Sequence, residues 1–138
     1  MSDVYEIAFQ IPGLPATTNA NGRKHWALKA KEARHWKKEV AAAIGYNKPS
    51  KPLPRASLTL TRASSVAPDF DGLVSSFKHV IDALRECGII SEDKLVNIGA
   101  PKYLWEPAPR GKGYIRVQVE ELKEGENGNL PPRPSPHR

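Results

Sequence analysis

The chain reads DFDGLVSSFKHVIDALRECGII from Asp69 to Ile90, and this stretch decides the fold class that we expect. At about 3.6 residues per turn, its large apolar side chains fall on one face of a helix over residues 71–86, which Gly88 would end. These side chains are Leu73, Phe77, Val80, Ile81 and Leu84. Such a face must be buried, so the stretch predicts a helix that packs on a sheet.

Segments on both sides of this helix alternate between apolar and polar residues, which is typical of half-buried strands. We place strands over residues 4–11, 56–62 and 115–119, and another over residues 95–98 that extends through Tyr103 to Trp105. A basic helix spans residues 27–44, and connectors rich in Pro or Gly separate these elements. The order β-α-β-α-β-β predicts an α+β fold, a small mixed β-sheet with helices packed on it.

The composition predicts one domain and excludes several classes of protein. We assign residues 1–122 to a single domain and residues 123–138 to a disordered tail, because the tail has too few apolar residues to offset the entropy of ordering it. No segment reaches the ~18 consecutive apolar residues of a membrane span, and the N-terminus lacks a signal-peptide pattern. Cys87 is the only cysteine, so no internal disulfide can form. We therefore expect a cytoplasmic protein without a membrane partner.

The net charge of +6 is distributed unevenly along the sequence. Residues 20–55 carry ten Lys or Arg against Glu32 and Glu39, a net charge of +8. Such a block is the pattern of a surface that binds DNA phosphates, and a solvated helix face is the alternative. The candidate DNA-binding residues are Arg23, Lys24, Lys29, Lys31, Arg34, Lys37 and Lys38. Trp26 and His25 could stack on an unpaired base, although Trp36, and with it Trp26, fits a core position better.

Acidic residues stand out against this basic background. Asp69 and Asp71 lie two residues apart at the start of the central helix, and Glu92-Asp93 follows that helix. Like charges so close repel each other unless a cation lies between them. On the polar face of the helix, Asp71, Ser75, Lys78 and Asp82 form a stripe in which Asp82 can pair with Lys78. An ordinary solvated face with acids near the helix dipole is the alternative interpretation.

These motifs together resemble the RusA family of phage and bacterial Holliday junction resolvases. The resemblance rests on Asp69-Phe70-Asp71-Gly72-Leu73, Lys78, Ile81-Asp82-Ala83-Leu84 and Gly88-Ile89-Ile90-Ser91-Glu92-Asp93. The first strand, the loop with Pro15 and Asn19, and the basic helix are also similar. Two positions depart from the family pattern. Gly72 stands where the family has Asn, and Lys78 lies three residues later than the helix lysine of the family.

The resemblance implies a homodimeric, Mg²⁺-dependent endonuclease that makes paired, symmetrical nicks in four-way DNA junctions. Asp69, Asp71 and Asp93 would be its catalytic carboxylates and metal ligands, and Glu92 an additional ligand. Lys78 would be the catalytic lysine that stabilises negative charge on the phosphate or the leaving oxygen. Two other functions remain open: a non-catalytic protein that binds branched DNA, and a nuclease that prefers forks or flaps.

Overall fold

The computed structural model describes residues 4–17 and 26–123, which form a mixed four-stranded sheet and four helices. In chain order the elements are β1 (Glu6–Pro12), α1 (Trp26–Ile44), β2 (Ala56–Ser64), α2 (Phe70–Ser76), α3 (Lys78–Glu86), α4 (Leu95–Ile98), β3 (Lys102–Pro107) and β4 (Tyr114–Glu121). The α+β class predicted from the sequence is therefore confirmed. The order differs from the predicted one, because three helices lie between β2 and β3.

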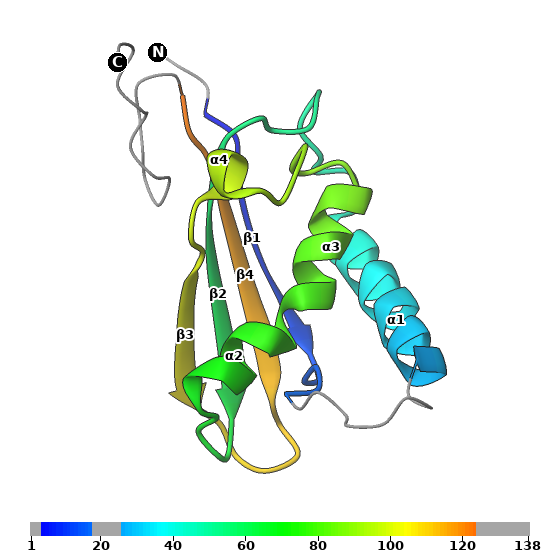
Figure 1. Ribbon diagram of the computed structural model, residues 1–138, viewed down its shortest axis with the longest axis vertical. Helices are drawn as coiled ribbons and strands as arrows, with labels where there is room; N and C mark the ends of the chain where they lie inside the picture. The colour runs from blue at the N-terminus through cyan, green and yellow to red at the C-terminus, as the bar shows by residue number, and fades with distance from the viewer. Residues whose placement is uncertain (1–3, 18–25, 124–138) are drawn as a thin grey trace.

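The strands are arranged in the order β1-β4-β2-β3. β4 is antiparallel to both of its neighbours, whereas β2 and β3 are parallel. It follows that β1, β2 and β3 all end at the same edge of the sheet, and Figure 1 shows α2 at that edge. The long connection from β2 to β3, which carries the acidic motifs, runs over the sheet face that the helices cover.

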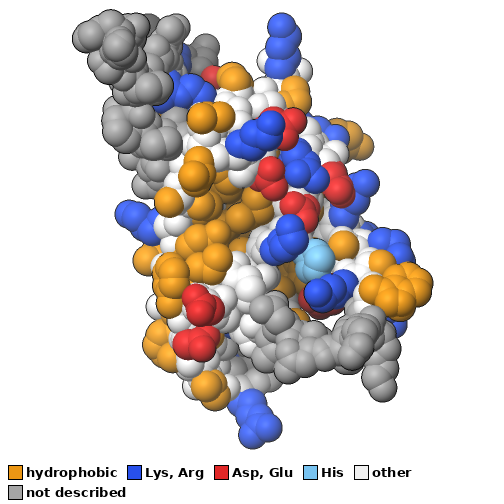
Figure 2. All heavy atoms as spheres, in the orientation of Figure 1, with side chains coloured by type: hydrophobic (Ala, Val, Ile, Leu, Met, Phe, Trp, Pro, Cys, Tyr) orange, Lys and Arg blue, Asp and Glu red, His pale blue; other side chains and the backbone are white. Residues whose placement is uncertain are grey.

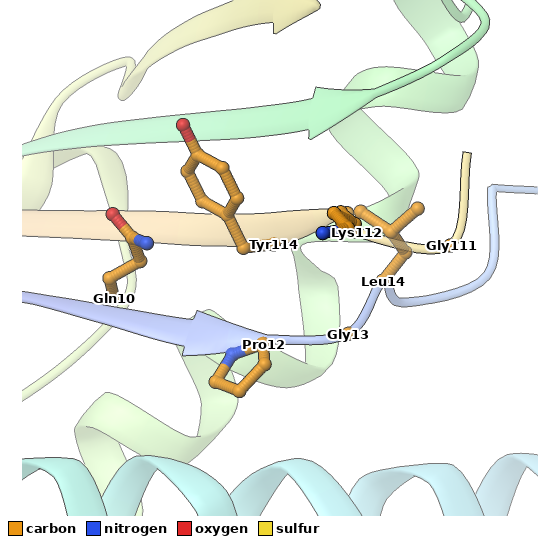
Figure 3. Close-up of a pocket in the computed structure, with 8 residues that line it drawn as sticks. Gln10, Pro12, Gly13, Leu14, Gly111, Lys112 and Tyr114 are labelled. Carbon is orange, nitrogen blue, oxygen red and sulfur yellow. The ribbon is translucent and has the colours of Figure 1, made fainter. Parts of the chain in front are cut away.

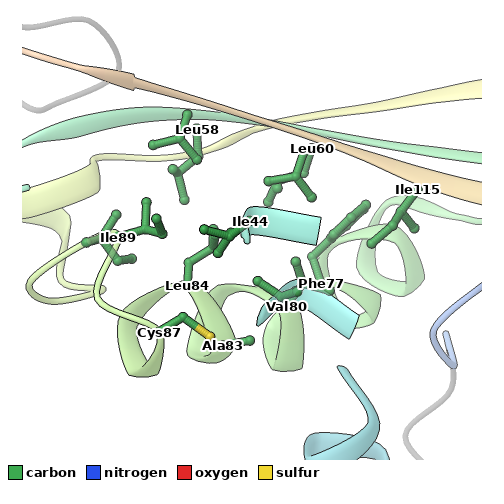
Figure 4. Packing of buried hydrophobic residues seen from close by; sticks show 14 of the residues in the cluster. Ile44, Leu58, Leu60, Phe77, Val80, Ala83, Leu84, Cys87, Ile89 and Ile115 are labelled. Atoms are coloured by element: carbon green, nitrogen blue, oxygen red, sulfur yellow. The ribbon is translucent and has the colours of Figure 1, made fainter. Parts of the chain in front are cut away.

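One face of the sheet supplies the core and the other stays largely polar. In β4, Ile115 and Val117 are fully buried, whereas Gln118, the next residue along the strand, is exposed. Figure 4 shows the core side, where Leu58 and Leu60 of β2 face Val80 and Leu84 of α3. On the opposite face the side chains of Ser57, Thr59 and Gln118 line an open surface. The helices thus cover one face of the sheet, as the apolar periodicity predicts.

The predicted helix over residues 71–86 is wrong in one respect, because it is broken at Phe77. Phe77 has φ −97° and ψ 4°, which ends α2 and begins α3. The hydroxyls of Ser75 and Ser76 donate to the carbonyls of Gly72 and Leu73, at 3.2 and 2.8 Å, and such bonds compete with a regular helix. The Phe77 side chain is fully buried and packs near Tyr103, which fixes the bend.

The predicted strand over residues 95–98 is also wrong, since these residues form the single turn α4. The amides of Asn97 and Ile98 donate to the carbonyl of Lys94. Only Ile98 is buried, while Leu95 and Val96 are 64% and 69% exposed, so the segment has no strand-like buried side. Gly99, at φ 61°, then turns the chain into β3. The extension through Tyr103 to Trp105 is confirmed as part of β3.

The other elements agree with the prediction to within a few residues. The basic helix was placed over residues 27–44 and spans Trp26–Ile44, with Trp36, Val40 and Ile44 buried. The strands at 4–11, 56–62 and 115–119 are shifted or lengthened at their ends. The disordered tail predicted for residues 123–138 lies outside the described residues except for Lys123.

Candidate functional site

Asp69 and Asp71 lie at the first turn of α2, and both side chains are exposed. Asp69 is the N-cap residue: its Oδ1 accepts a hydrogen bond from the amide of Gly72 at 2.8 Å. Asp71 follows in the first turn, where a carboxylate is stabilised by the helix dipole. The backbone of α2 therefore holds two carboxylates close together at the edge where three strands end.

Gly72 lies directly against the Asp69 carboxylate. A Cβ atom at residue 72 would lie 2.8 Å from Asp69 Oδ1 and 3.5 Å from Thr17 Cβ. The segment before α1 also reaches this turn, because Ser75 Oγ donates to the carbonyl of Thr17 at 3.0 Å. The glycine that departs from the family pattern thus leaves room for the capping carboxylate, whereas the 3.5 Å to Thr17 is an ordinary contact distance.

Ser75, Lys78, Asp82 and Asp93 line one groove of about 310 Å³. The groove is also lined by the apolar side chains of Val74, Ile81, Leu95, Ile98, Pro101 and Tyr103. Three of the four residues of the predicted polar stripe therefore share a surface despite the break at Phe77. The stripe does not continue to Asp71, which is not among the residues that line the groove.

Ion pairs connect the charged side chains of this groove. Lys78 Nζ lies 3.7 Å from Asp82 Oδ2, which confirms the predicted pair four residues apart. Arg85 Nη1 lies 4.0 Å from Asp82 Oδ1 and 3.4 Å from Asp93 Oδ2. The Asp93 carboxylate, which the resemblance assigns to a metal, is therefore paired with a guanidinium that the sequence analysis did not consider.

The predicted carboxylate ligands lie in two groups. Figure 2 shows acidic side chains over the start of α2 and others over α3 and the following loop, with mainly hydrophobic surface between them. Within residues 4–17 and 26–123, no group of three or more His, Cys, Asp or Glu side chains is placed to hold a metal ion. Mg²⁺, however, is commonly bound by one or two carboxylates, substrate phosphates and water. Asp69 and Asp71 fit this smaller donor set, and Asp93 is not part of it.

The basic helix α1 presents exposed cationic side chains next to α3. It packs against α3, where Lys37 Nζ lies 3.7 Å from Glu86 Oε1. Lys29, Lys31, Arg34, Lys37 and Lys38 are all exposed, whereas Arg23, Lys24 and His25 lie outside the described residues. Trp36 is a core residue as predicted, but Trp26 is 74% exposed, so placing it in the core was wrong. An exposed indole remains able to stack on a base.

The turn before β4 carries two further cationic side chains, Arg110 and Lys112. Both side chains are exposed, and Lys112 lines a hollow of about 480 Å³. Figure 3 shows this hollow between the end of β1 and the start of β4, with Leu14 at one side. Gly113 permits the approach of Leu14, since a Cβ there would lie 2.6 Å from Leu14 Cδ1. The hollow faces a different part of the surface from the acidic groove and shares no lining residue with it.

Sequence reasoning missed two arginines with contrasting environments. Arg116 donates to both carboxylate oxygens of Glu106, at 3.3 and 3.0 Å, and Tyr114 also donates to Glu106. Hydrogen bonds from Arg116 and Tyr114 hold the pKa of Glu106 below its usual range. Arg62 is only 8% exposed, and burial lowers the pKa of its guanidinium. The sequence did carry a signal for the burial of Arg62, because this residue continues the alternation of Leu58 and Leu60 on the buried side of the strand.

Comparison of the sequence with known families and with curated proteins finds no family model and no curated relative that matches. In the part of the chain that the structure describes, no helix is both long enough and apolar enough to span a membrane.

Proposed function

We propose that this protein is a Mg²⁺-dependent endonuclease that resolves four-way DNA junctions by paired nicks. The observation that carries the proposal is the pair of exposed carboxylates, Asp69 and Asp71, which α2 holds at the edge where β1, β2 and β3 end. The groove with Lys78 and Asp93 and the basic helix α1 provide the other groups that the resemblance to RusA resolvases calls for.

Asp69 and Asp71 would hold the metal ion, because hard carboxylate oxygens are the ligands that Mg²⁺ prefers. When bound, Mg²⁺ supplies a Lewis acid that neutralises phosphate charge and makes a water molecule more acidic. The cap keeps Asp69 in a fixed position, since its Oδ1 is already hydrogen-bonded to the Gly72 amide. Asp71 makes no hydrogen bond or ion pair within the described residues, so its carboxylate is available.

Lys78 would act on the DNA strand from the groove next to α2. The Lys78 side chain is 73% exposed and can approach a phosphate oxygen, where its ammonium would stabilise developing negative charge. Asp93 lies in the same groove, and its ion pair with Arg85, at 3.4 Å, would hold that guanidinium toward a DNA phosphate.

The exposed cations of α1 would supply most of the affinity for DNA. Lysine and arginine side chains bind phosphates with release of counterions, which carries little information about the base sequence. The exposed Trp26 at the start of α1 would stack on a base that is unpaired at the junction. Paired nicks on opposite strands call for two active sites related by a two-fold axis, so we propose a C2 homodimer.

The test is incubation of a labelled four-way junction and a matched linear duplex with the protein, in Mg²⁺ or in EDTA. We expect symmetrical nicks in the junction alone and only with Mg²⁺. Asp71→Asn should abolish nicking and leave the band shift and the melting temperature unchanged. Equal loss of binding and nicking would indicate misfolding, and Mg²⁺-independent nicking would refute the metal site. Light scattering of the protein–junction complex checks for two subunits, and one subunit per junction would contradict the dimer.

A second candidate function is that of a non-catalytic protein that binds branched DNA. The pairing of Asp93 with Arg85 favours it, because the third predicted ligand is neutralised. A tight, salt-sensitive band shift with DNA that stays intact in Mg²⁺ would support this function instead. A nuclease for forks or flaps would nick those substrates faster than the junction in the same assay.

A further inference from the structure

Arg62 is a buried cation whose charge is not matched in the described part of the chain. It follows Leu58 and Leu60 on the helix-facing side of β2, with Ile115 and Trp105 as its neighbours in register. Its relative exposure is 8%, and its Nε atom is buried without a hydrogen-bond partner. None of the carboxylates of residues 4–17 and 26–123 forms an ion pair with it.

Such an arrangement is costly for the free protein. A buried guanidinium without a counter-charge loses its hydration and regains little of it from one carbonyl. The one hydrogen bond that the described residues give it runs from Nη1 to the carbonyl of Pro15, at 2.6 Å. Holding that carbonyl needs only a neutral donor, so it does not explain why this position carries an arginine. Residues 18–25, which follow the contacting segment in the chain, contain no Asp or Glu that could supply the missing charge.

The position of Arg62 relates it to the acidic pair. The segment from Pro15 to Thr17 touches Arg62 at one end and α2 at the other, where Ser75 Oγ donates to the Thr17 carbonyl. A Cβ at Gly72, one residue after Asp71, would lie 3.5 Å from Thr17 Cβ. Two residues of extended chain span at most about 7 Å. The guanidinium and the first turn of α2 therefore flank the same short segment.

We propose that Arg62 binds a phosphate group, and that this is a phosphate of the DNA strand lying beside Asp69 and Asp71. A guanidinium binds phosphate through two parallel N–H···O bonds, which would give Nε the acceptor that it lacks. Assigning the phosphate to DNA rests on the proposed function, whereas the anion site itself does not. The phosphate would supply the negative charge that the protein leaves open and would place the strand next to the two carboxylates.

The first test compares thermal unfolding in sodium phosphate and in sodium chloride at the same pH and ionic strength. For the wild type we expect phosphate, at about ten times its Kd, to raise the Tm by about 5 °C. Arg62→Met should show no such shift, and its Tm in chloride should equal or exceed that of the wild type, because it removes an unmatched buried charge. Arg62→Lys keeps the positive charge but lacks the two parallel N–H donors of a guanidinium, so it should show a smaller shift than the wild type.

Arg116→Met is the matched control, because Arg116 is also partly buried but is fully paired with Glu106. This variant should lose stability in chloride and keep the phosphate shift. The inference is overturned if the wild type shows no phosphate shift, if Arg62→Met keeps it, or if Arg62→Met unfolds or melts several degrees lower in chloride. The last result would mean that Arg62 serves only to hold Pro15.

The second test measures junction nicking by the same variants. We expect Arg62→Met to nick about 100-fold more slowly than the wild type, since the strand is no longer positioned. If the wild type shows an Arg62-dependent phosphate shift but never nicks DNA, the proposed function fails and the anion site stands. If Arg62→Met nicks DNA at the wild-type rate, the inference fails and the proposed function stands.

Discussion

Asp69 has two tasks in this structure that substitution can separate. Its Oδ1 caps α2 by accepting from the Gly72 amide at 2.8 Å, and its negative charge would hold the metal ion. Asp69→Ala removes both, whereas Asp69→Asn keeps an oxygen acceptor for the cap and removes the charge. Asparagine caps helices about as well as aspartate does. The pair of variants therefore distinguishes a structural role from a catalytic one at a single position.

The expected magnitudes follow from the position of α2. Loss of a cap hydrogen bond costs about 1 kcal/mol, and loss of a charge near the helix dipole costs about 0.5 kcal/mol. Leu73 and Ser76 are buried and join α2 to the core, so the cost should appear in global unfolding. Asp69→Ala should thus lose about 1.5 kcal/mol, a fall in Tm of about 5 °C. Asp69→Asn should lose only the smaller, electrostatic part.

Both variants should nick the junction about 100-fold more slowly than the wild type, since neither has the carboxylate. Urea unfolding followed by tryptophan fluorescence, to which the buried Trp36 contributes, gives the free energies, and the labelled junction gives the rates. The reasoning about the cap is refuted if the two variants are equally destabilised. The reasoning about the metal is refuted if Asp69→Asn nicks at the wild-type rate while it remains folded.

Three further predictions use other positions. Gly72→Ala should push the Asp69 carboxylate off the cap, so Asp69→Ala should cost almost nothing in that background; additive free energies of unfolding in a double-mutant cycle would contradict this. Lys38→Gln should weaken junction binding at every sequence and lower the slope of log K against log salt by about 0.9, and an unchanged slope in a salt titration would exclude a phosphate contact. Burial raises the pKa of the Cys87 thiol, so this group stabilises the fold at pH values below its unfolded pKa and loses that contribution as the pH rises through the folded pKa. Cys87→Ala should therefore flatten the alkaline fall of stability in urea unfolding, whereas an identical pH profile would show that the thiol has the same pKa in the folded and unfolded states.

The parts of the fold that could be predicted depend on local periodicity. The spacing of Trp36, Val40 and Ile44 predicted α1, and the alternation of Ile115 and Val117 predicted β4, because the core selects these patterns residue by residue. The break at Phe77 could not be predicted, since it depends on the packing of that ring near Tyr103 on a strand far along the chain. The four-residue turn α4 was mistaken for a strand because so short an apolar run fits either structure.

The same distinction applies to the candidate site. The Lys78–Asp82 pair was predicted because both residues lie on one helix, four positions apart. The pair between Arg85 and Asp93, and the burial of Arg62 beneath Pro15, depend on how the connections fold back onto the sheet. Sequence motifs indicated which carboxylates to examine, but only the tertiary structure places Asp93 with a guanidinium and apart from Asp69.

The pairing of β1 with β4 has a consequence for how the chain reaches this structure. Glu6 lies opposite Glu120, and the Tyr5 amide donates to Glu121 Oε1. The first strand therefore cannot pair until β4, near the end of the domain, is present. Contacts between residues so distant in the chain form slowly. The pairing of β2 also depends on β4, because β4 lies between β1 and β2 in the sheet. During synthesis, β1 and β2 must remain without their shared neighbour until nearly all of the domain has left the ribosome. Truncation before Tyr114 would leave β1 unpaired and one side of the β2–β3 pair open, and such open strand edges are prone to aggregate.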